Sequence, residues 1–578
     1  MCGIFGTTPF HKGELDKAQR ALERMRHRGP DQYGEWFDSK VFMGHRRLSI
    51  LDLSDAGRQP MMNSDEETII TVNGEIYNYQ SIKADLLGEY EFRSKSDSEV
   101  ILHGYSEWGL NGILDRIDGM YAFAIYDRKK KIVHLVRDRV GIKPLYYSLC
   151  DGRLTWSSEM KSILSFIDRR KLEVDNTAIC DFYTYNYIPS PKTTYKNIFK
   201  LPPAHYLTID LETLSHKLIR YWNIEDHEIK ISLEEAKDKV KYLITKSVQE
   251  QMMSDVPVGF FFSGGLDSST VVALASHVSA KLNAYTIGFN EPDSDETAYA
   301  ETVAKKYNVS LQKRILGFQD AEKLIEQVLD LYDEPFGDLS AIPTFCVSKF
   351  ARENVTVVLT GDGGDEVFGG YHWYTDIHEN KVIASEILNR YLSFLRRYFK
   401  YRFIGRAAGK IQFMYLLNRF EKMIRYQEAF LGIEKDPIKQ MLGIPKDYED
   451  YWYFEQHFNP SLSPRKALQR MDFATYLPDD ILTKVDRASM AVSLEARVPL
   501  LSREIIEFVF SLSEELIYTN DELKGLLKLV LKDLLPESII NRKKKGFSIP
   551  VAKWSRNGMF KGKPFQGFII DNMLKKNM

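Results

Sequence analysis

The pattern of apolar residues changes near residue 233, and this change most constrains how the 578-residue chain can fold. Before about residue 220, short apolar or alternating runs separated by turn residues are typical of packed antiparallel sheets. These runs are ETIITVNGEIYN (67–78), GMYAFAIYD (119–127), KIVHLVRDR (131–139), PLYYSL (144–149), RLTWSS (153–158) and HYLTID (205–210). The segment SDSEVILHGYSEWG (96–109) is instead typical of a capped helix, and the proline-punctuated residues 187–203 indicate irregular structure.

Predicted helices and strands alternate beyond residue 233. The segments are a serine-capped helix (232–252), the strand, turn and helix VGFFFSGGLDSSTVVALASHV (258–278), a strand (282–289), a helix (295–308) and a third strand with an acidic loop, VTVVLTGDGGDEVF (355–368). This alternation predicts a parallel, doubly wound α/β sheet, in which ligands bind at the carboxyl ends of the strands. We therefore predict two domains: an α+β domain of layered antiparallel sheets over residues 2–215, and an α/β domain over residues 230–578.

Composition narrows the class of protein. Hydrophobic residues make up 44% and charged residues 27%, and the formal net charge is −2, so we expect neither a nucleic-acid nor a membrane partner. Residues 371–470 are rich in aromatic and basic side chains, which favours a helical insertion over a nucleic-acid helix. The four cysteines are far apart, which predicts a reducing compartment without disulfides or zinc. With no signal peptide and no long apolar run, we predict a soluble, cytoplasmic protein.

The turn SGGLDSS (263–269) lies between a predicted strand and a predicted helix. Small residues let backbone N–H groups approach an anion there, and the helix N-terminus adds a favourable dipole. The Walker A pattern is absent. The turn resembles the signature loop of the ATP-pyrophosphatases, which cleave ATP between its α and β phosphates. This resemblance implies ATP contacts at these residues: Phe261, Ser263, Gly264, Gly265, Asp267, Ser268, Ile287, Thr360 and Gly361.

The second acidic loop, TGDGGDE (360–366), matches the same family. Mg²⁺ prefers carboxylate oxygens and bridges phosphate oxygens, and the resemblance implies that Asp267 and Asp365 hold Mg²⁺ with pyrophosphate. Asp362 matches an acidic residue that acts near the bound intermediate, where some members carry Glu. Lys524 matches a lysine that stabilises the adenylation transition state, although read alone it is also typical of a surface helix. Residues 482–501 match a further segment, and their polar side chains are expected to orient substrate or brace the site: Lys484, Asp486, Arg487, Glu495 and Arg497.

The N-terminal stretch CGIFG resembles the start of class II glutamine amidotransferases, which are N-terminal-nucleophile hydrolases. A thiol of ordinary pKa needs a nearby base, and the α-amine of the same residue has a reference pKa of about 7.7–8.0. The resemblance implies that Met1 is removed and that Cys2 attacks the side-chain amide of glutamine. It also implies an oxyanion hole from Asn73 and Gly74, and glutamine contacts from Arg47, Glu75 and Asp97. The stretch RHRGPD (26–31) is expected to brace this site.

The two sets of motifs together resemble the glutamine-hydrolysing asparagine synthetase family over essentially the whole chain. That family implies glutamine, aspartate and Mg-ATP as small-molecule substrates, β-aspartyl-AMP as intermediate, ammonia transfer inside the protein, and a homodimer. An amidotransferase that acts on another carboxylate, such as a sugar uronic acid in surface-polysaccharide synthesis, would carry nearly the same motifs. A catalytically inactive relative is disfavoured by intact Cys2, Asn73 and Asp267. A lone glutaminase is disfavoured by SGGLDSS, and a β-lactam-forming cyclase by Cys2.

Overall fold

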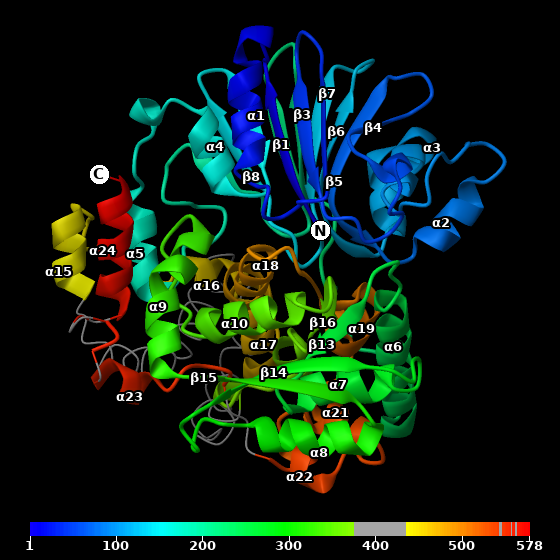
Figure 1. Ribbon diagram of the computed structural model, residues 1–578, viewed down its shortest axis with the longest axis vertical. Helices are drawn as coiled ribbons and strands as arrows, with labels where there is room; N and C mark the ends of the chain where they lie inside the picture. The colour runs from blue at the N-terminus through cyan, green and yellow to red at the C-terminus, as the bar shows by residue number, and fades with distance from the viewer. Residues whose placement is uncertain (375–434, 543–545, 557, 561–562, 564, 578) are drawn as a thin grey trace, which may run out of the picture.

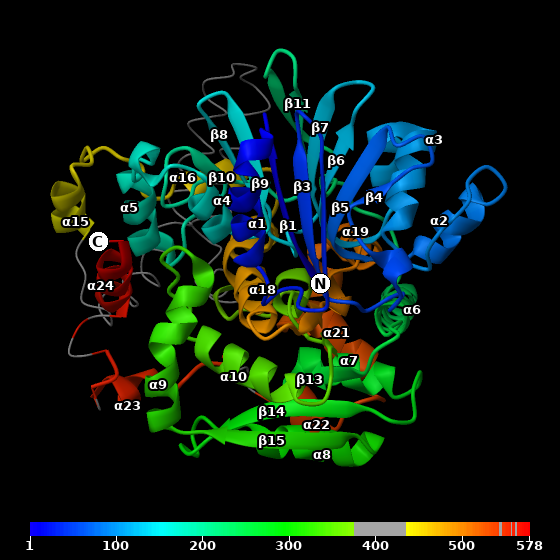
Figure 2. The same cartoon turned by 45° about the horizontal axis from the view of Figure 1, so that its top comes forward.

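The computed structural model describes residues 1–374, 435–542, 546–556, 558–560, 563 and 565–577 (Figure 1). Two antiparallel sheets occupy the N-terminal part, and a parallel sheet with its helices occupies the C-terminal part. In both views the chain starts at the boundary between the two parts, beneath the strands of the N-terminal sheets (Figures 1 and 2). The first residues of the chain therefore lie against the C-terminal part.

The N-terminal sheets each have six strands, in the orders β10-β8-β9-β1-β3-β2 and β12-β11-β7-β6-β5-β4. The strands are β1 (Cys2–Thr8), β2 (Gln32–Phe37), β3 (Phe42–Arg47), β4 (Met61–Met62), β5 (Thr68–Ile76), β6 (Gly119–Asp127), β7 (Ile132–Arg137), β8 (Tyr146–Cys150), β9 (Arg153–Ser157), β10 (Ile198–Lys200), β11 (His205–Asp210) and β12 (His216–Arg220). The helices are α1 (Leu15–Glu23), α2 (Tyr79–Leu86), α3 (Glu99–Arg116), α4 (Met160–Phe166) and α5 (Asn176–Tyr185). The predicted strands and the helix after residue 96 are confirmed.

Side chains that alternate between the two faces of each strand explain how the sheets and helices are layered. In β6, Ala122 and Ala124 pack between the two sheets, whereas Phe123 and Ile125 face the cluster under α2 and α3. On the other sheet, Phe5 packs against Leu22 of α1. Successive strand side chains point to opposite faces, so each sheet buries both faces and the layers run helix, sheet, sheet, helix. The predicted layered antiparallel fold is confirmed.

The C-terminal sheet has five parallel strands in the order β15-β14-β13-β16-β17. They are β13 (Val258–Phe261), β14 (Asn283–Phe289), β15 (Ser310–Leu316), β16 (Val357–Leu359) and β17 (Glu495–Arg497). Helix α10 (Ala341–Arg352) lies on the side facing the N-terminal sheets and α8 (Thr297–Tyr307) on the other, as both views show (Figures 1 and 2). The doubly wound sheet is confirmed, but β15 and β17 were missing from the sequence prediction.

The C-terminal part contains further helices. They are α6 (Leu233–Gln251), α7 (Leu266–Ala275), α9 (Phe318–Leu329), α11 (Gly364–Phe368), α15 (Lys435–Leu442), α16 (Trp452–His457), α17 (Pro464–Ala474), α18 (Thr483–Met490), α19 (Arg503–Phe510), α20 (Glu514–Ile517), α21 (Gly525–Leu531), α22 (Glu537–Ile540), α23 (Val551–Arg556) and α24 (Phe565–Asn577). Ser232 and Glu235 form the capping box expected for α6. The described part of the predicted insertion contains helices α15 to α17, joined by turns and loops, and its residues 375–434 lie outside the described residues.

One apolar cluster crosses the boundary between the two parts. It includes Met1, Met120 and Ile142 from the N-terminal part and Ala496 and Val498 from the C-terminal part. These side chains are 0–7% exposed. Across the stretches of chain described here, no helix has both the length and the hydropathy that a membrane crossing requires.

Candidate active sites

Cys2 is the first residue of β1 and is hydrogen-bonded into the sheet beside β3, where its partner in register is Arg47. Its side chain is buried, and its backbone N–H donates to Asn73 Oδ1 at 2.9 Å. Burial raises the pKa of the Cys2 thiol, while the N-terminal ammonium and Arg47 act in the opposite direction. A buried thiol in this setting needs a base close by before it can act as a nucleophile.

Asn73 and Gly74 lie on β5, directly beside Cys2. Asn73 is fully buried, and among the described residues its Nδ2 group has no hydrogen-bond partner. A buried donor left without a partner is costly, so such a group is typical of a site that receives a ligand. At Gly74, a Cβ atom would lie 2.1 Å from the carbonyl oxygen of Met120, so only glycine fits between β5 and β6. The oxyanion hole formed by Asn73 and Gly74 stays a prediction.

Arg47 is buried at the end of β3, and each of its two Nη atoms donates twice. The acceptors are Gln32 Oε1 at 2.7 Å, and the carbonyl oxygens of Ser54 at 3.0 Å, Leu51 at 3.0 Å and Asp52 at 2.5 Å. A Cβ atom on Gly57 would lie 2.1 Å from Nη2, so the guanidinium is tightly enclosed. Its role in holding the carboxylate of glutamine stays a prediction, because a bound carboxylate would have to replace one of these acceptors.

Glu75, which follows Gly74 on β5, forms a buried acidic pair with Asp97. Asp97 accepts a hydrogen bond from the N–H of Ile76 at 2.7 Å. Burial, reinforced by Glu495, raises the pKa of Asp97 to about 6. Burial and the nearby carboxylates of Asp97 and Glu495 raise the pKa of Glu75 further above its usual value. Two carboxylates in one buried space provide a place for a cation such as an α-ammonium group.

The loop after β13 forms the second site, at the carboxyl end of the parallel sheet. Phe261 ends β13 and Ile287 lies in the neighbouring β14. Ser263 Oγ lies 3.2 Å from Ser268 Oγ, which closes the turn, and Gly264 has a positive φ of 72° that glycine adopts without strain. A Cβ atom on Gly361 would lie 2.6 Å from the backbone nitrogen of Ser268, so the two loops touch through glycine.

Lys524 joins these two loops. Its Nζ lies 2.7 Å from Asp365 Oδ1 and also donates to Asp267, and the lysine is buried. It precedes α21 with a φ of 55°, so it is not the surface helix lysine that its sequence alone permits. Asp267, Asp365 and Lys524 therefore meet at one point, although they come from segments far apart in the chain. Gly370 allows this approach, since a Cβ there would lie 2.0 Å from Asp365 Oδ1.

The carboxylates of Asp267 and Asp365 fit a Mg²⁺ site in their chemistry. Mg²⁺ is usually bound by one or two carboxylates together with substrate phosphates and water. Among the described residues, no group of three or more His, Cys, Asp or Glu side chains forms a complete metal cage. The donor set therefore suits a metal ion that is bound together with phosphates.

Asp362 belongs to a second group of acidic side chains, together with Asp338 and Asp480, around Lys484. The sequence did not reveal that these residues come together. Burial raises the pKa of Asp362, and Lys484 counteracts this effect. Lys484 Nζ lies 2.8 Å from Asp338 Oδ2, and burial together with Asp338 raises the pKa of Asp480 well above its usual value. Thr360 N–H donates to the carbonyl oxygen of Arg497 at 2.9 Å and so ties this loop to β17.

Arg28 connects the first site to the C-terminal part. Its side chain is fully buried, and its Nε donates to the carbonyl oxygen of Cys2 at 3.0 Å. Its Nη1 lies 2.8 Å from Asp486 Oδ2 and 3.0 Å from Glu159 Oε1. The stretch 26–31 and the segment 482–501 therefore meet in one ion-pair network. The sequence indicated that both stretches mattered, but gave no sign that they pair.

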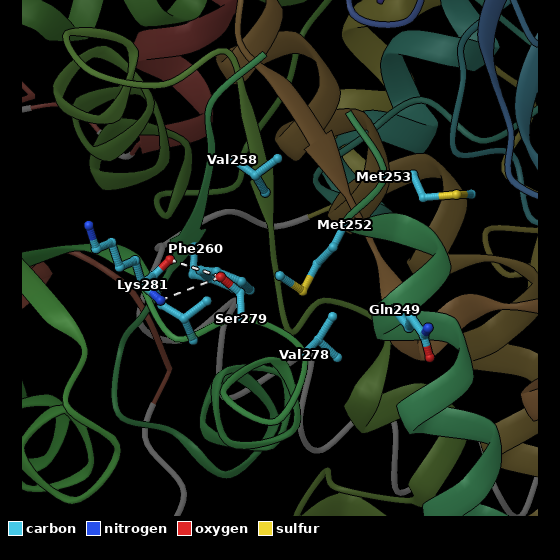
Figure 3. A pocket seen from close by; sticks show the side chains of 9 residues that line it. Gln249, Met252, Met253, Val258, Phe260, Val278, Ser279 and Lys281 are labelled. Carbon is cyan, nitrogen blue, oxygen red and sulfur yellow. Dashed lines mark hydrogen bonds between the residues drawn. The ribbon is translucent and has the colours of Figure 1, made fainter. Parts of the chain in front are cut away.

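A separate cavity lies at the opposite end of β13 from the SGGLDSS loop. Figure 3 shows the side chains that line it, among them Met252, Val258 and Phe260. Its volume is 490 Å³. Val258 starts β13, whereas the predicted ATP contacts follow its end, so this cavity contains no predicted site residue.

The two parts of the chain match two family models. Residues 1–222 match the glutamine amidotransferase domain, and residues 239–562 match asparagine synthase. The fold and the two sites thus define a glutamine amidotransferase domain joined to a synthase domain. The chain belongs to the asparagine synthase family.

Relatives with this arrangement occur in bacteria and archaea. The chain is 30% identical to glutamine-hydrolyzing asparagine synthetase 1 of Bacillus subtilis (strain 168), with 97% of this chain and 88% of that protein covered. It is 36% identical to the putative glutamine-hydrolyzing asparagine synthetase 2 of Methanocaldococcus jannaschii, with 85% and 98% covered. A solved glutamine phosphoribosylpyrophosphate amidotransferase from B. subtilis shares 15% identity at a TM-score of 0.31, with 62% of this chain and 82% of that chain covered.

Proposed function

We propose that this protein is a carbon–nitrogen ligase that makes asparagine from aspartate, with ATP as energy source and glutamine as nitrogen donor. The Nδ2 of Asn73, buried near Cys2 with no hydrogen-bond partner among the described residues, is the observation that carries the glutaminase half. Family membership and the convergence of Lys524 with Asp267 and Asp365 support the synthetase half. The substrates are small molecules, and we propose a cytoplasmic homodimer whose two domains span residues 2–215 and 230–578.

The glutaminase step follows from the position of Cys2. Once Met1 is removed, the α-amine of Cys2 accepts the thiol proton, and the sulfur attacks the side-chain amide carbon of glutamine. Asn73 Nδ2 and the N–H of Gly74 donate to the oxygen that becomes negative. Ammonia leaves with the proton from the amine, and water then hydrolyses the thioester to glutamate. Glu75 and Asp97 hold the α-ammonium of glutamine, and Arg47 its carboxylate.

The synthetase step takes place at the carboxyl end of the parallel sheet. The β-carboxylate of aspartate attacks the α-phosphorus of ATP, and pyrophosphate leaves. Backbone N–H groups of the loop 263–268 bind the phosphates, and the Lys524 cation stabilises the negative charge that develops. Asp267 and Asp365 would hold Mg²⁺, which neutralises phosphate charge when bound. Ammonia then attacks the β-aspartyl carbonyl and AMP leaves, and Asp362 would take a proton from the incoming nitrogen.

Ammonia would pass between the sites through the protein. In water at neutral pH it is mostly protonated and no nucleophile, so an interior route preserves its reactivity. The apolar cluster that contains Met120, Ile142, Ala496 and Val498 crosses the boundary between the two parts and supports such a route.

The test uses the purified protein with Mg-ATP, glutamine and aspartate, and follows asparagine and pyrophosphate together. Equal amounts of both are expected. Cys2→Ala should abolish glutamine-dependent synthesis and leave ammonia-dependent synthesis intact, whereas Asp267→Ala should stop both. Glutamate release without aspartate-dependent pyrophosphate would contradict aspartate as the acceptor, and uronic acids would then be tested in the same assay.

A further inference from the structure

Side chains from elsewhere in the chain hold the backbone of Cys2. The N–H of Leu48 donates to the carbonyl oxygen of Met1 at 3.2 Å, and this hydrogen bond is lost once Met1 is removed. Two contacts belong to Cys2 itself and do not involve Met1. Its nitrogen donates to Asn73 Oδ1 at 2.9 Å, and its carbonyl oxygen accepts from Arg28 Nε at 3.0 Å. As the new terminal residue, Cys2 therefore relies on these two side chains for its orientation.

A carboxylate from the other half of the chain orients the guanidinium of Arg28. Asp486 accepts from both of its Nη atoms, with Nη1 2.8 Å from Oδ2 and Nη2 3.1 Å from Oδ1. Glu159 Oε1 also accepts from Nη1, at 3.0 Å. The side chains of Arg28 and Asp486 are 0% and 3% exposed. A bidentate arginine–carboxylate pair fixes the guanidinium plane, so Asp486 sets the direction in which Arg28 Nε donates to Cys2.

The position of Asp486 is set by helix α18, which is buried over residues 484–490. This helix lies beside the start of the chain in both views (Figures 1 and 2). On the same helix, Arg487 Nη2 lies 2.6 Å from Asp333 Oδ2, and Lys484 Nζ lies 2.8 Å from Asp338 Oδ2. These ion pairs join α18 to another segment of the C-terminal part, so the synthetase half determines where Asp486 stands.

We propose that Asp486 is a positioning residue of the glutamine site: it orients Arg28, and Arg28 in turn holds the carbonyl of Cys2. The inference rests on the proposed function. Neither Asp486 nor Arg28 is among the expected glutamine contacts, so both act on the nucleophile and not on substrate binding. A misplacement of about 1 Å can cost about 10²-fold in rate. A carboxylate of the synthetase half thus aligns the nucleophile of the glutaminase half.

A role limited to charge compensation predicts a different result for Asp486→Asn. Glu159 would still give Arg28 a negative partner, and glutamine hydrolysis would continue unchanged. If Asp486 orients the guanidinium, the amide of Asn puts a donor where the bidentate pair needs an acceptor, and the pair is lost. In that case kcat for glutamate release should fall about 10–100-fold while KM for glutamine stays unchanged.

The experiment measures glutamate release and ammonia-dependent pyrophosphate release by the full-length protein for Asp486→Asn and Asp333→Asn. The readout is the ratio of the two rates, because a variant that folds only in part loses both activities together. Asp333→Asn is the matched control. The side chain of Asp333 is 5% exposed and pairs with Arg487, next to Asp486, and its φ of 61° suits asparagine. The ratio should fall about 10–100-fold in Asp486→Asn and stay unchanged in Asp333→Asn. Equal ratios in the two variants would overturn the inference.

A second variant decides if Asp486→Asn does not fold. Arg28→Lys keeps the positive charge but cannot donate to Cys2 and to both carboxylate oxygens of Asp486 in one plane. A ratio lowered about tenfold at unchanged KM for glutamine supports the inference, and an unchanged ratio overturns it. Where both variants fold, the double variant should be no slower than the slower single one, because the two residues act in series; losses that add would overturn the inference. Glutamine hydrolysis that persists in Cys2→Ala would instead overturn the proposed function itself.

Discussion

Replacing Asn73 with alanine tests the oxyanion hole most directly, because this side chain has two separable contacts. Its Oδ1 accepts the N–H of Cys2 at 2.9 Å, and its Nδ2 is buried without a partner among the described residues. The first contact holds the nucleophile's strand in place. The second donor is available to a substrate oxygen.

The two contacts predict separate effects, one on kcat and one on the free energy of unfolding. Loss of one oxyanion donor costs about 2.7–4 kcal/mol of transition-state stabilisation, so kcat for glutamine hydrolysis should fall about 10²–10³-fold in Asn73→Ala. Loss of the acceptor leaves the Cys2 nitrogen buried without a partner, which should lower the free energy of unfolding by about 1–3 kcal/mol. Asn73→Asp keeps the acceptor and removes the donor. It should therefore lose activity to a similar extent with little change in stability.

The assay follows glutamate release for both variants, with urea unfolding for stability and ammonia-dependent synthesis as a control on the second site. Ammonia-dependent synthesis should stay unchanged. The reasoning would be refuted if Asn73→Asp hydrolysed glutamine as fast as the unsubstituted protein, since the Nδ2 donor would then have no role in the reaction.

Three further predictions concern charged groups. KM for glutamine should rise as pH falls through about 6 and should be flat above pH 6. The reason is that the carboxylate of Asp97, whose pKa is raised to about 6, becomes protonated and loses its negative charge in this range. A KM independent of pH from 5 to 8 would contradict the role of Asp97 in holding glutamine. Arg28→Met should lower the free energy of unfolding by about 3–5 kcal/mol, since it leaves buried carboxylates uncompensated. Arg26→Met, at a side chain 70% exposed, is the urea-unfolding control and should cost at most about 1 kcal/mol. Lys524→Met should stop aspartate-dependent pyrophosphate release while glutamate release continues; unchanged pyrophosphate release would contradict its role at the phosphates.

Most regular elements of the fold could be predicted from the sequence because their signals are local. Alternation in residues 119–127 predicted β6, and the serine and glutamate around residue 232 predicted the start of α6. The strand–turn–helix around SGGLDSS likewise follows from residues next to one another in the chain.

Two strands of the parallel sheet were missing from that prediction for physical reasons. β15 is an edge strand whose residues are largely exposed, so its sequence SLQKRIL carries polar side chains and no apolar run. β17 has three residues, EAR, and its buried charged side chains pair with each other and with groups from distant parts of the chain. Local hydrophobicity carries no signal for a strand of this kind.

The sequence by itself predicted the candidate site residues: Cys2 near the N-terminus, the glycine-rich loop 263–269 and the acidic loop 360–366. It also determined the layered sheets, because alternation and turn residues act over a few positions. Only the tertiary structure decided which of these residues meet. Lys524 meets Asp267 and Asp365, Arg28 meets Asp486, and Glu495 meets the N-terminal amine. The two partners of each pair are more than a hundred residues apart in the chain. Such pairs depend on how buried charges are compensated in the folded chain, and that compensation leaves no periodic trace in the sequence.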